Sequence, residues 1–68
     1  MTLNQALKLC KEQKRRVRPL SWRGLFPGHW VEFRAGVFVE HGQLEEILHA
    51  LRLSTPEELL GKWEEYLA

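Results

Sequence analysis

The segment 29–41, "HWVEFRAGVFVEH", limits the choice of fold more than any other part of the chain. Two runs of β-branched and aromatic residues are separated by Ala35 and Gly36, and glycine adopts the positive φ that a tight turn requires. A two-residue turn places Phe33 opposite Phe38 on one face of the resulting hairpin. The opposite face carries three further apolar side chains, Trp30, Val37 and Val39. Both faces of this predicted hairpin therefore need a cover.

Two capping patterns predict where helices begin. Thr2 and Gln5 have the spacing of a capping box, and apolar residues then recur at helical spacing, which predicts a helix over residues 3–14. Thr55 and Glu58 repeat the pattern with proline between them. The leucine-rich spacing of the C-terminal part predicts two short helices, at about 43–53 and 56–67.

Residues 16–22 are predicted to form an extended edge segment, because Pro19 cannot donate a hydrogen bond to a central strand. The "GLFPGH" segment that follows is predicted to be a loop. These elements together predict an α+β fold with an N-terminal helix, a small antiparallel sheet containing the hairpin at 29–41, and a helical C-terminal segment. With no linker or repeat, residues 1–68 are expected to form a single small domain.

A chain of 68 residues with one cysteine is near the lower size limit for a domain that folds alone. Self-association would add buried area, so we expect a homo-oligomer. No apolar run is long enough for a membrane span, and the lone thiol without an export signal predicts a cytoplasmic location. For a phage-encoded protein, that would be the host cytoplasm.

Charge is distributed unevenly along the chain. Residues 1–23 carry seven basic groups against one glutamate, which gives +6, whereas residues 24–68 carry three against eight, which gives −5. This asymmetry could steer a small anion to one side, or it could hold the two ends of the chain together. The second, structural interpretation is at least as well supported by the residues.

Catalytic patterns are absent from the sequence. There is no aspartate, no glycine-rich phosphate loop and no histidine pair at metal-ligand spacing, so we expect no enzyme activity, no metal and no cofactor. Cys10 lies on the apolar side of the predicted helix and is expected to be a buried structural thiol.

A binding role has more support. The stretch "RRVRPLSWRG" places four arginines around a tryptophan, and guanidinium groups bind phosphates while an indole stacks on bases. The candidate ligand-binding residues are Arg16, Arg18, Trp22, Arg23 and Trp30. We expect Trp22 to pack inward and Arg18 to help line a binding surface. Strict alternation along the extended segment would place Arg18 beside Trp22, as a stacking, phosphate-binding pair. The structural alternative is that Trp22 fills the core and the arginines pair with the C-terminal glutamates.

The two ends of the chain resemble the second type of Thoeris anti-defence family, a group of small phage proteins. "LNQALKLCKEQKRRVRPLSW" is similar to the family's opening helix and extended "K-V-R-R-x-x-W" segment, and "LSTPEELLGKWEEY" is similar to its closing motif. Residues 43–52 form an insertion between these matches. The resemblance implies a strand rather than a helix at 62–67.

The resemblance also implies a function. Proteins of this family bind and sequester a cyclic ADP-ribose-type signal without degrading it, and they form homo-oligomers with ligand pockets between subunits. We therefore expect a non-catalytic binding protein for a cyclic ADP-ribose-type or cyclic nucleotide signal. The alternative is a small regulator that binds nucleic acid or a protein, such as a phage inhibitor of a host protein; nucleic acid is the less favoured ligand.

Overall fold

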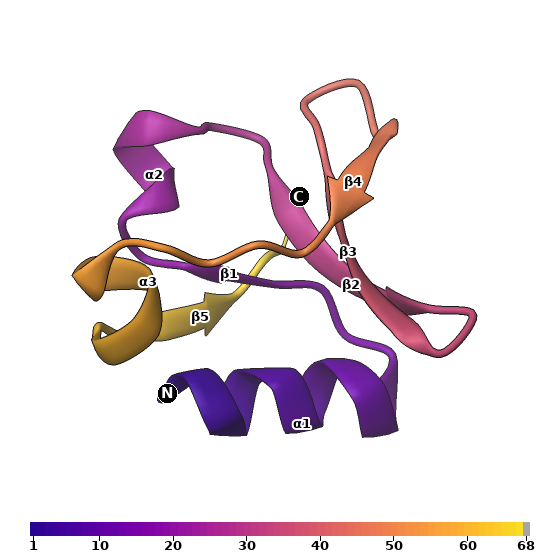
Figure 1. Cartoon of the computed structure of the whole chain (residues 1–68), viewed down its shortest axis with the longest axis horizontal. Helices are drawn as coiled ribbons and strands as arrows, with labels where there is room; N and C mark the ends of the chain where they lie inside the picture. Colours follow the sequence, from indigo (N-terminus) through magenta and orange to yellow (C-terminus); the bar gives the residue numbers. More distant parts are fainter. Residues whose placement is uncertain (68) are drawn as a thin grey trace.

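The computed structural model describes residues 1–67 and has an α+β fold, as predicted. The elements in chain order are α1 (Leu3–Gln13), β1 (Val17–Pro19), α2 (Trp22–Leu25), β2 (Trp30–Arg34), β3 (Val37–His41), β4 (Ile47–Ala50), α3 (Pro56–Leu60) and β5 (Trp63–Glu65). The five strands form one antiparallel sheet in the order β4-β3-β2-β1-β5 (Figure 1). No helix within residues 1–67 is long and apolar enough to cross a bilayer.

Helix α1 begins and ends as its sequence predicts. Thr2 accepts a hydrogen bond from the Gln5 amide, and the Gln5 side chain accepts one from the Thr2 amide, which completes the capping box. Lys14 ends the helix in the left-handed conformation, with φ of 58°. The helix covers one face of the sheet with Ala6 and Cys10 (Figure 1).

The predicted hairpin is confirmed in its register. Phe33 pairs with Phe38 across β2 and β3, and the turn between the strands contains Ala35 at φ 52° and Gly36 at φ 82°. The hairpin's second apolar face is covered in part by the same chain, since Val39 is 7% exposed whereas Val37, at the turn end, is 51% exposed. Trp30 on that face is only 4% exposed, and Arg16 lies over its ring.

The predicted helix at 43–53 is wrong. Residues 42–46 instead form a turn, in which the Gly42 amide donates to the Glu46 carbonyl oxygen, and β4 then pairs with β3. A helix here would have left the outer edge of β3 unpaired, so the sheet overrides the helical spacing of the leucines. Leu44 from that pattern lies 86% exposed, whereas Leu51 and Leu53 pack against the core.

The predicted helix at 56–67 is wrong in its second half. The Thr55–Glu58 capping box is present, with Pro56 at the start of the helix, but α3 ends at Leu60. Strand β5 follows and pairs with β1, in agreement with the strand that the family resemblance implied at 62–67. Helical spacing failed here because Gly61 ends the helix and Trp63 fills the core.

The predicted edge segment at 16–22 is wrong in its position, because β1 lies between β2 and β5 inside the sheet. The predicted segment is also longer than the observed strand. Only β1 (Val17–Pro19) is extended, and Trp22 starts the four-residue helix α2 within the segment predicted to be extended or looped. Val17 and Pro19 are buried and Arg18 is partly exposed, as alternation predicted. The buried core joins α1 to the sheet and consists of Ala6, Cys10, Val17, Trp22, Val31 and Trp63.

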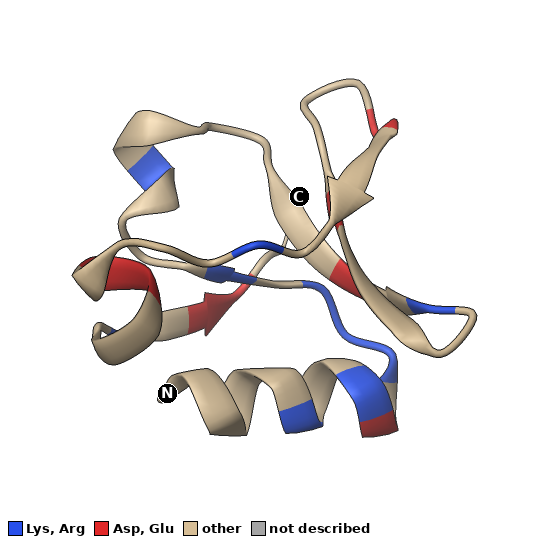
Figure 2. Ribbon diagram, in the orientation of Figure 1, with Lys and Arg blue, Asp and Glu red and all other residues tan. Residues whose placement is uncertain are grey.

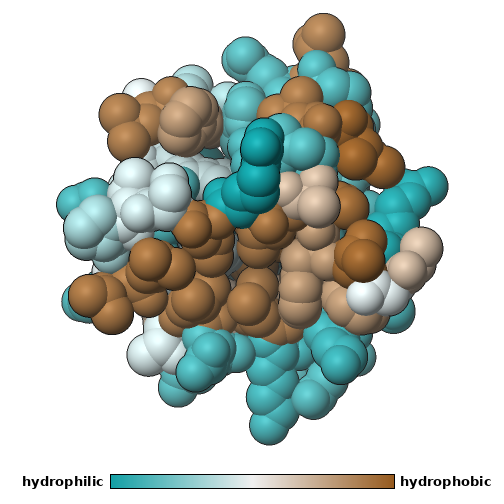
Figure 3. Space-filling view, in the orientation of Figure 1, coloured by the Kyte–Doolittle hydropathy of each residue, from teal (hydrophilic) through white to brown (hydrophobic). Residues whose placement is uncertain are grey.

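Figure 3 shows where apolar side chains remain at the surface. A band of them crosses the middle of the face that carries α1, from the α3 side to the β2–β3 turn. The segment between β4 and α3 crosses this face in front of β1 (Figure 1). It brings Leu51 and Leu53 onto the core and leaves Arg52 exposed.

Candidate functional site

Four of the five predicted binding residues are held together on the sheet face that points away from α1. Side chains alternate across a strand, so Arg16, Arg18 and Trp30 lie opposite the buried Val17 and Val31. Strand β5 places Glu64 beside Arg18 and brings Tyr66 next to Arg16. We call this surface the basic face; it consists of Arg16, Arg18, Arg23, Trp30, His41, Glu64 and Tyr66.

Two guanidinium groups of the basic face stack on two aromatic rings. The Arg16 guanidinium carbon lies 4.2 Å from the centre of the Trp30 ring, and that of Arg18 lies 5.0 Å from the centre of the Tyr66 ring. The two rings are nearly parallel, with 10° between their planes and 6.4 Å between their centres. Each guanidinium is therefore positioned by a cation–π contact.

Glu64 links two arginines of the basic face. It accepts a hydrogen bond from Arg18 Nε at 2.8 Å and accepts two from Arg23, one of them from Nε at 2.8 Å. The bonds from Arg23 lower the pKa of Glu64 to about 2, with Arg18 adding to the effect and burial opposing it. Glu64 thus stays ionised and holds both guanidinium groups in place near neutral pH.

Arg16 is held less tightly than Arg18. Its nearest carboxylate oxygen, Glu45 Oε1, is 3.8 Å away, beyond hydrogen-bond distance, and its side chain is 45% exposed. The three guanidinium groups of the basic face lie near two carboxylates, those of Glu64 and Glu45, so one positive charge remains uncompensated. Figure 2 shows basic residues before and on β1 and acidic residues on β5.

His41 packs against the Trp30 ring, which also carries the Arg16 guanidinium. Its ring is parallel to Trp30, with 3° between the planes and 3.9 Å between the centres. Its Nδ1 lies 3.0 Å from the carbonyl oxygen of Glu45, and its Nε2 lies 2.8 Å from Glu32 Oε1. His41 thereby fixes the β3–β4 turn, and Glu45 with it, beside Arg16.

Trp22 does not belong to the basic face. It is 2% exposed, and its indole Nε1 donates to Glu58 Oε2 at 2.7 Å on the α1 side of the sheet. The predicted pair of Arg18 with Trp22 is wrong, because α2 turns the tryptophan into the core and Tyr66 takes its place beside Arg18. The structural alternative is confirmed for Trp22. It also describes the arginines, since Arg15, Arg18 and Arg23 pair with C-terminal glutamates.

Sequence reasoning missed Tyr66, Glu64 and His41. The pattern "WEEY" would have revealed the first two if it had been interpreted as a strand, because Glu64 and Tyr66 then alternate with the buried Trp63 onto one face. His41 is the residue paired with Trp30 in the predicted hairpin, so its position beside that ring followed from the register.

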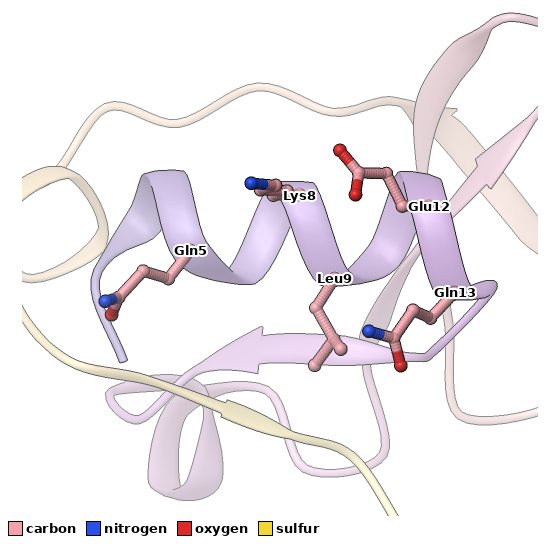
Figure 4. A pocket seen from close by; sticks show the side chains of 5 residues that line it. All are labelled: Gln5, Lys8, Leu9, Glu12 and Gln13. Atoms are coloured by element: carbon pink, nitrogen blue, oxygen red, sulfur yellow. The ribbon is translucent and has the colours of Figure 1, made fainter.

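Three further features bear on catalysis and metal binding: the Cys10 thiol, the set of possible metal ligands, and a pocket on α1. Cys10 is 1% exposed, and burial raises its pKa to about 11, so the thiol is protonated and shielded. Across residues 1–67, no group of three His, Cys, Asp or Glu side chains is arranged to hold a metal ion. A shallow pocket of about 220 Å³ on α1 is lined by Gln5, Lys8, Leu9, Glu12 and Gln13 (Figure 4). Its side chains diverge along the helix and converge on no common point (Figure 4).

Comparisons with protein-family models, with curated proteins and with solved structures found no match to this chain.

Proposed function

We propose that this protein is a non-catalytic binding protein that sequesters a small anionic ligand of the cyclic ADP-ribose or cyclic nucleotide type. The basic face is the binding surface. The observation that supports this function is the stacking of Arg16 on Trp30 and of Arg18 on Tyr66, side by side on one sheet face. Guanidinium groups fixed in this way present N–H groups to phosphate oxygens, and Tyr66 offers a ring on which a base stacks.

The charge of the basic face favours a small ligand over a nucleic-acid duplex. Duplex binding requires several uncompensated cations along a track, whereas Arg15, Arg18 and Arg23 each pair with a glutamate. Arg18 and Arg23 share the one carboxylate of Glu64, and Arg16 has only the more distant Glu45 oxygen at 3.8 Å among the ion pairs of the described residues. A ligand with one or two phosphates matches this arrangement better than a polyanion does.

A homo-oligomer is part of the proposal. Strands β4 and β5 are the two edges of the sheet, and β4 carries Ile47 and Leu48 at 48% and 41% exposure. Edge strands with apolar side chains are surfaces on which a second copy pairs. Light scattering at micromolar protein should give a mass of at least two chains, and a monodisperse monomer would contradict this part.

Binding is tested by calorimetric titration of the purified chain with cyclic ADP-ribose, with cyclic dinucleotides and with duplex DNA. We expect saturable binding of a cyclic nucleotide-type ligand whose affinity changes little between low and high salt. Arg16→Ala should weaken that binding at least about tenfold, because one charge-assisted contact is worth about 1.5–3 kcal/mol. Arg15→Ala is the matched control, since Arg15 pairs with Glu65 and lies outside the basic face.

Two results would overturn the proposal. Equal affinities for the wild type, Arg16→Ala and Arg18→Ala would show that the arginines only hold the fold together. Tight binding to duplex DNA that weakens steeply with salt would favour the nucleic-acid regulator instead.

A further inference from the structure

A second concave surface lies on the opposite side of the sheet from the basic face. It is a cleft of about 510 Å³ between α2, β4 and the segment that leads to α3, and its lining includes Trp22, Phe26, His29, Glu40, Leu48 and His49. In Figure 3, polar side chains lie here between the apolar groups of α2 and those of β4. The proposed function makes no use of this cleft.

A buried carboxylate forms part of the cleft wall. Glu40 on β3 is 8% exposed, and its Oε2 accepts a hydrogen bond from His29 Nδ1 at 2.9 Å. The second oxygen, Oε1, has His49 Nε2 as its neighbour at 3.7 Å, which is too long for a hydrogen bond. Glu40 Oε1 therefore receives no hydrogen bond from either histidine.

The contacts of His49 determine which kind of group can bind beside Glu40 Oε1. His49 Nδ1 lies 2.8 Å from the carbonyl oxygen of Ala50, and a carbonyl oxygen only accepts, so Nδ1 carries the proton. In the neutral ring, Nε2 then presents a lone pair toward Glu40 Oε1. These two acceptors lie 3.7 Å apart and repel each other unless a donor with several N–H groups bridges them from the open side of the cleft.

The charge and the shape of the cleft also favour a cationic donor with an apolar group. The ionised groups that line the cleft are Glu40, Glu58 and Arg52, which gives a formal charge of −1 when the histidines are neutral. Glu58 is already engaged, since Trp22, Ser54 and Thr55 all donate to its carboxylate and occupy three of its about four acceptor sites. Phe26 and Leu48, at 44% and 41% exposure, provide an apolar wall.

We propose that this cleft binds a small primary amine, whose ammonium group bridges Glu40 Oε1 and His49 Nε2 from the open side of the cleft and whose apolar group packs against Phe26 and Leu48. An ammonium has three N–H donors and no acceptor, so it satisfies both facing acceptors at once. The site is independent of the basic face and of the anionic ligand proposed for it.

The test uses the full chain and three probes of matched shape, which are 2-phenylethylamine, 2-phenylethanol and phenylacetate. Titrations followed by NMR at a pH where histidine is neutral should give saturable shifts at Phe26, Leu48 and His49 with the amine. The alcohol should bind at least about tenfold more weakly, because it lacks the charge-assisted bond. Phenylacetate should not bind.

Three variants make the result specific. Glu40→Gln should reduce amine affinity at least about tenfold, whereas Glu57→Gln, an exposed glutamate outside the cleft, should leave it unchanged. If Glu40→Gln fails to fold, Phe26→Ser is the second variant; it should weaken 2-phenylethylamine several-fold but leave methylamine unchanged. The proposal is overturned if the amine and the alcohol bind equally, if Glu40→Gln binds as the wild type does, or if no probe saturates because His49 has closed onto Glu40.

Discussion

Glu58 is the residue whose replacement should reveal most about how this small domain holds together. Its carboxylate is buried at 7% exposure and accepts three hydrogen bonds, from the Trp22 indole at 2.7 Å and from the Ser54 and Thr55 amides at 2.9 and 3.1 Å. Burial raises the pKa of Glu58, but these bonds outweigh it and the pKa lies below its usual value. One side chain thus joins α2 to the start of α3.

Glu58→Ala should therefore be severe. It leaves the Trp22 indole N–H in the core without a partner, at about 1–3 kcal/mol, and it removes half of a capping box, at about 1 kcal/mol. The added cavity brings the expected loss of unfolding free energy to about 3–5 kcal/mol. A domain of this length has a total stability of about 3–10 kcal/mol, so the variant should be close to unfolding.

Urea unfolding followed by tryptophan fluorescence measures this loss. Glu58→Gln keeps the volume but replaces one accepting oxygen by an NH2 group, and should cost about 2–3 kcal/mol. Glu57→Ala, one residue earlier and exposed, should cost less than about 1 kcal/mol. In a cycle with Trp22→Phe, the two side chains should couple by about 1–2 kcal/mol. A loss under about 1 kcal/mol for Glu58→Ala, or no coupling, would refute the reasoning.

Three further predictions concern the core and the basic face. Trp63→Ala should lower the unfolding free energy by about 3–5 kcal/mol in urea titrations, because Trp63 is 1% exposed in the core; a loss below about 1 kcal/mol would contradict its role. The Cys10 thiol, whose pKa burial raises to about 11, should react with a thiol reagent only as fast as the chain unfolds; rapid labelling of folded protein would contradict this. Glu64 has a folded-state pKa of about 2 against 4.5 unfolded, so its stabilisation is present above pH 4.5 and lost as pH falls toward 2. Wild type should then exceed Glu64→Gln in stability at neutral pH and converge with it in acid, and a gap independent of pH would disprove the link.

Local rules predicted those parts of the fold that neighbouring residues decide. Both capping boxes and the Ala35–Gly36 turn formed where their residues predicted, because caps and turns depend on hydrogen bonds over three or four residues. The register of the hairpin then followed from the turn. The fold class followed in turn from the order of these elements.

The C-terminal half could not be predicted in the same way. The leucines at 43–53 satisfy helical spacing, but β3 has an edge that needs a partner, and only the assembled sheet reveals that need. The same holds for β5, which pairs with β1 across more than forty residues of sequence. Long-range pairing of this kind leaves no local pattern.

The candidate site was predicted in its composition more than in its geometry. Arg16, Arg18, Arg23 and Trp30 do lie on one face, because strand alternation and the hairpin register place them there. Trp22 was misplaced since Pro19 ends β1 and a helical turn follows, which reverses the direction of the tryptophan. Tyr66 became its replacement only through β5.

The central claim, that this protein captures a small anionic nucleotide-type ligand without converting it, is tested most directly by capture and recovery. A cyclic ADP-ribose-type ligand or a cyclic dinucleotide is mixed with a slight molar excess of this protein. Ultrafiltration then separates the free ligand from the protein. The retained fraction is then heated to denature the protein, and the released ligand is analysed by chromatography. We predict that the ligand disappears from the filtrate and returns chemically intact after heating. Ligand that stays in the filtrate, or a new product peak after heating, would contradict the account.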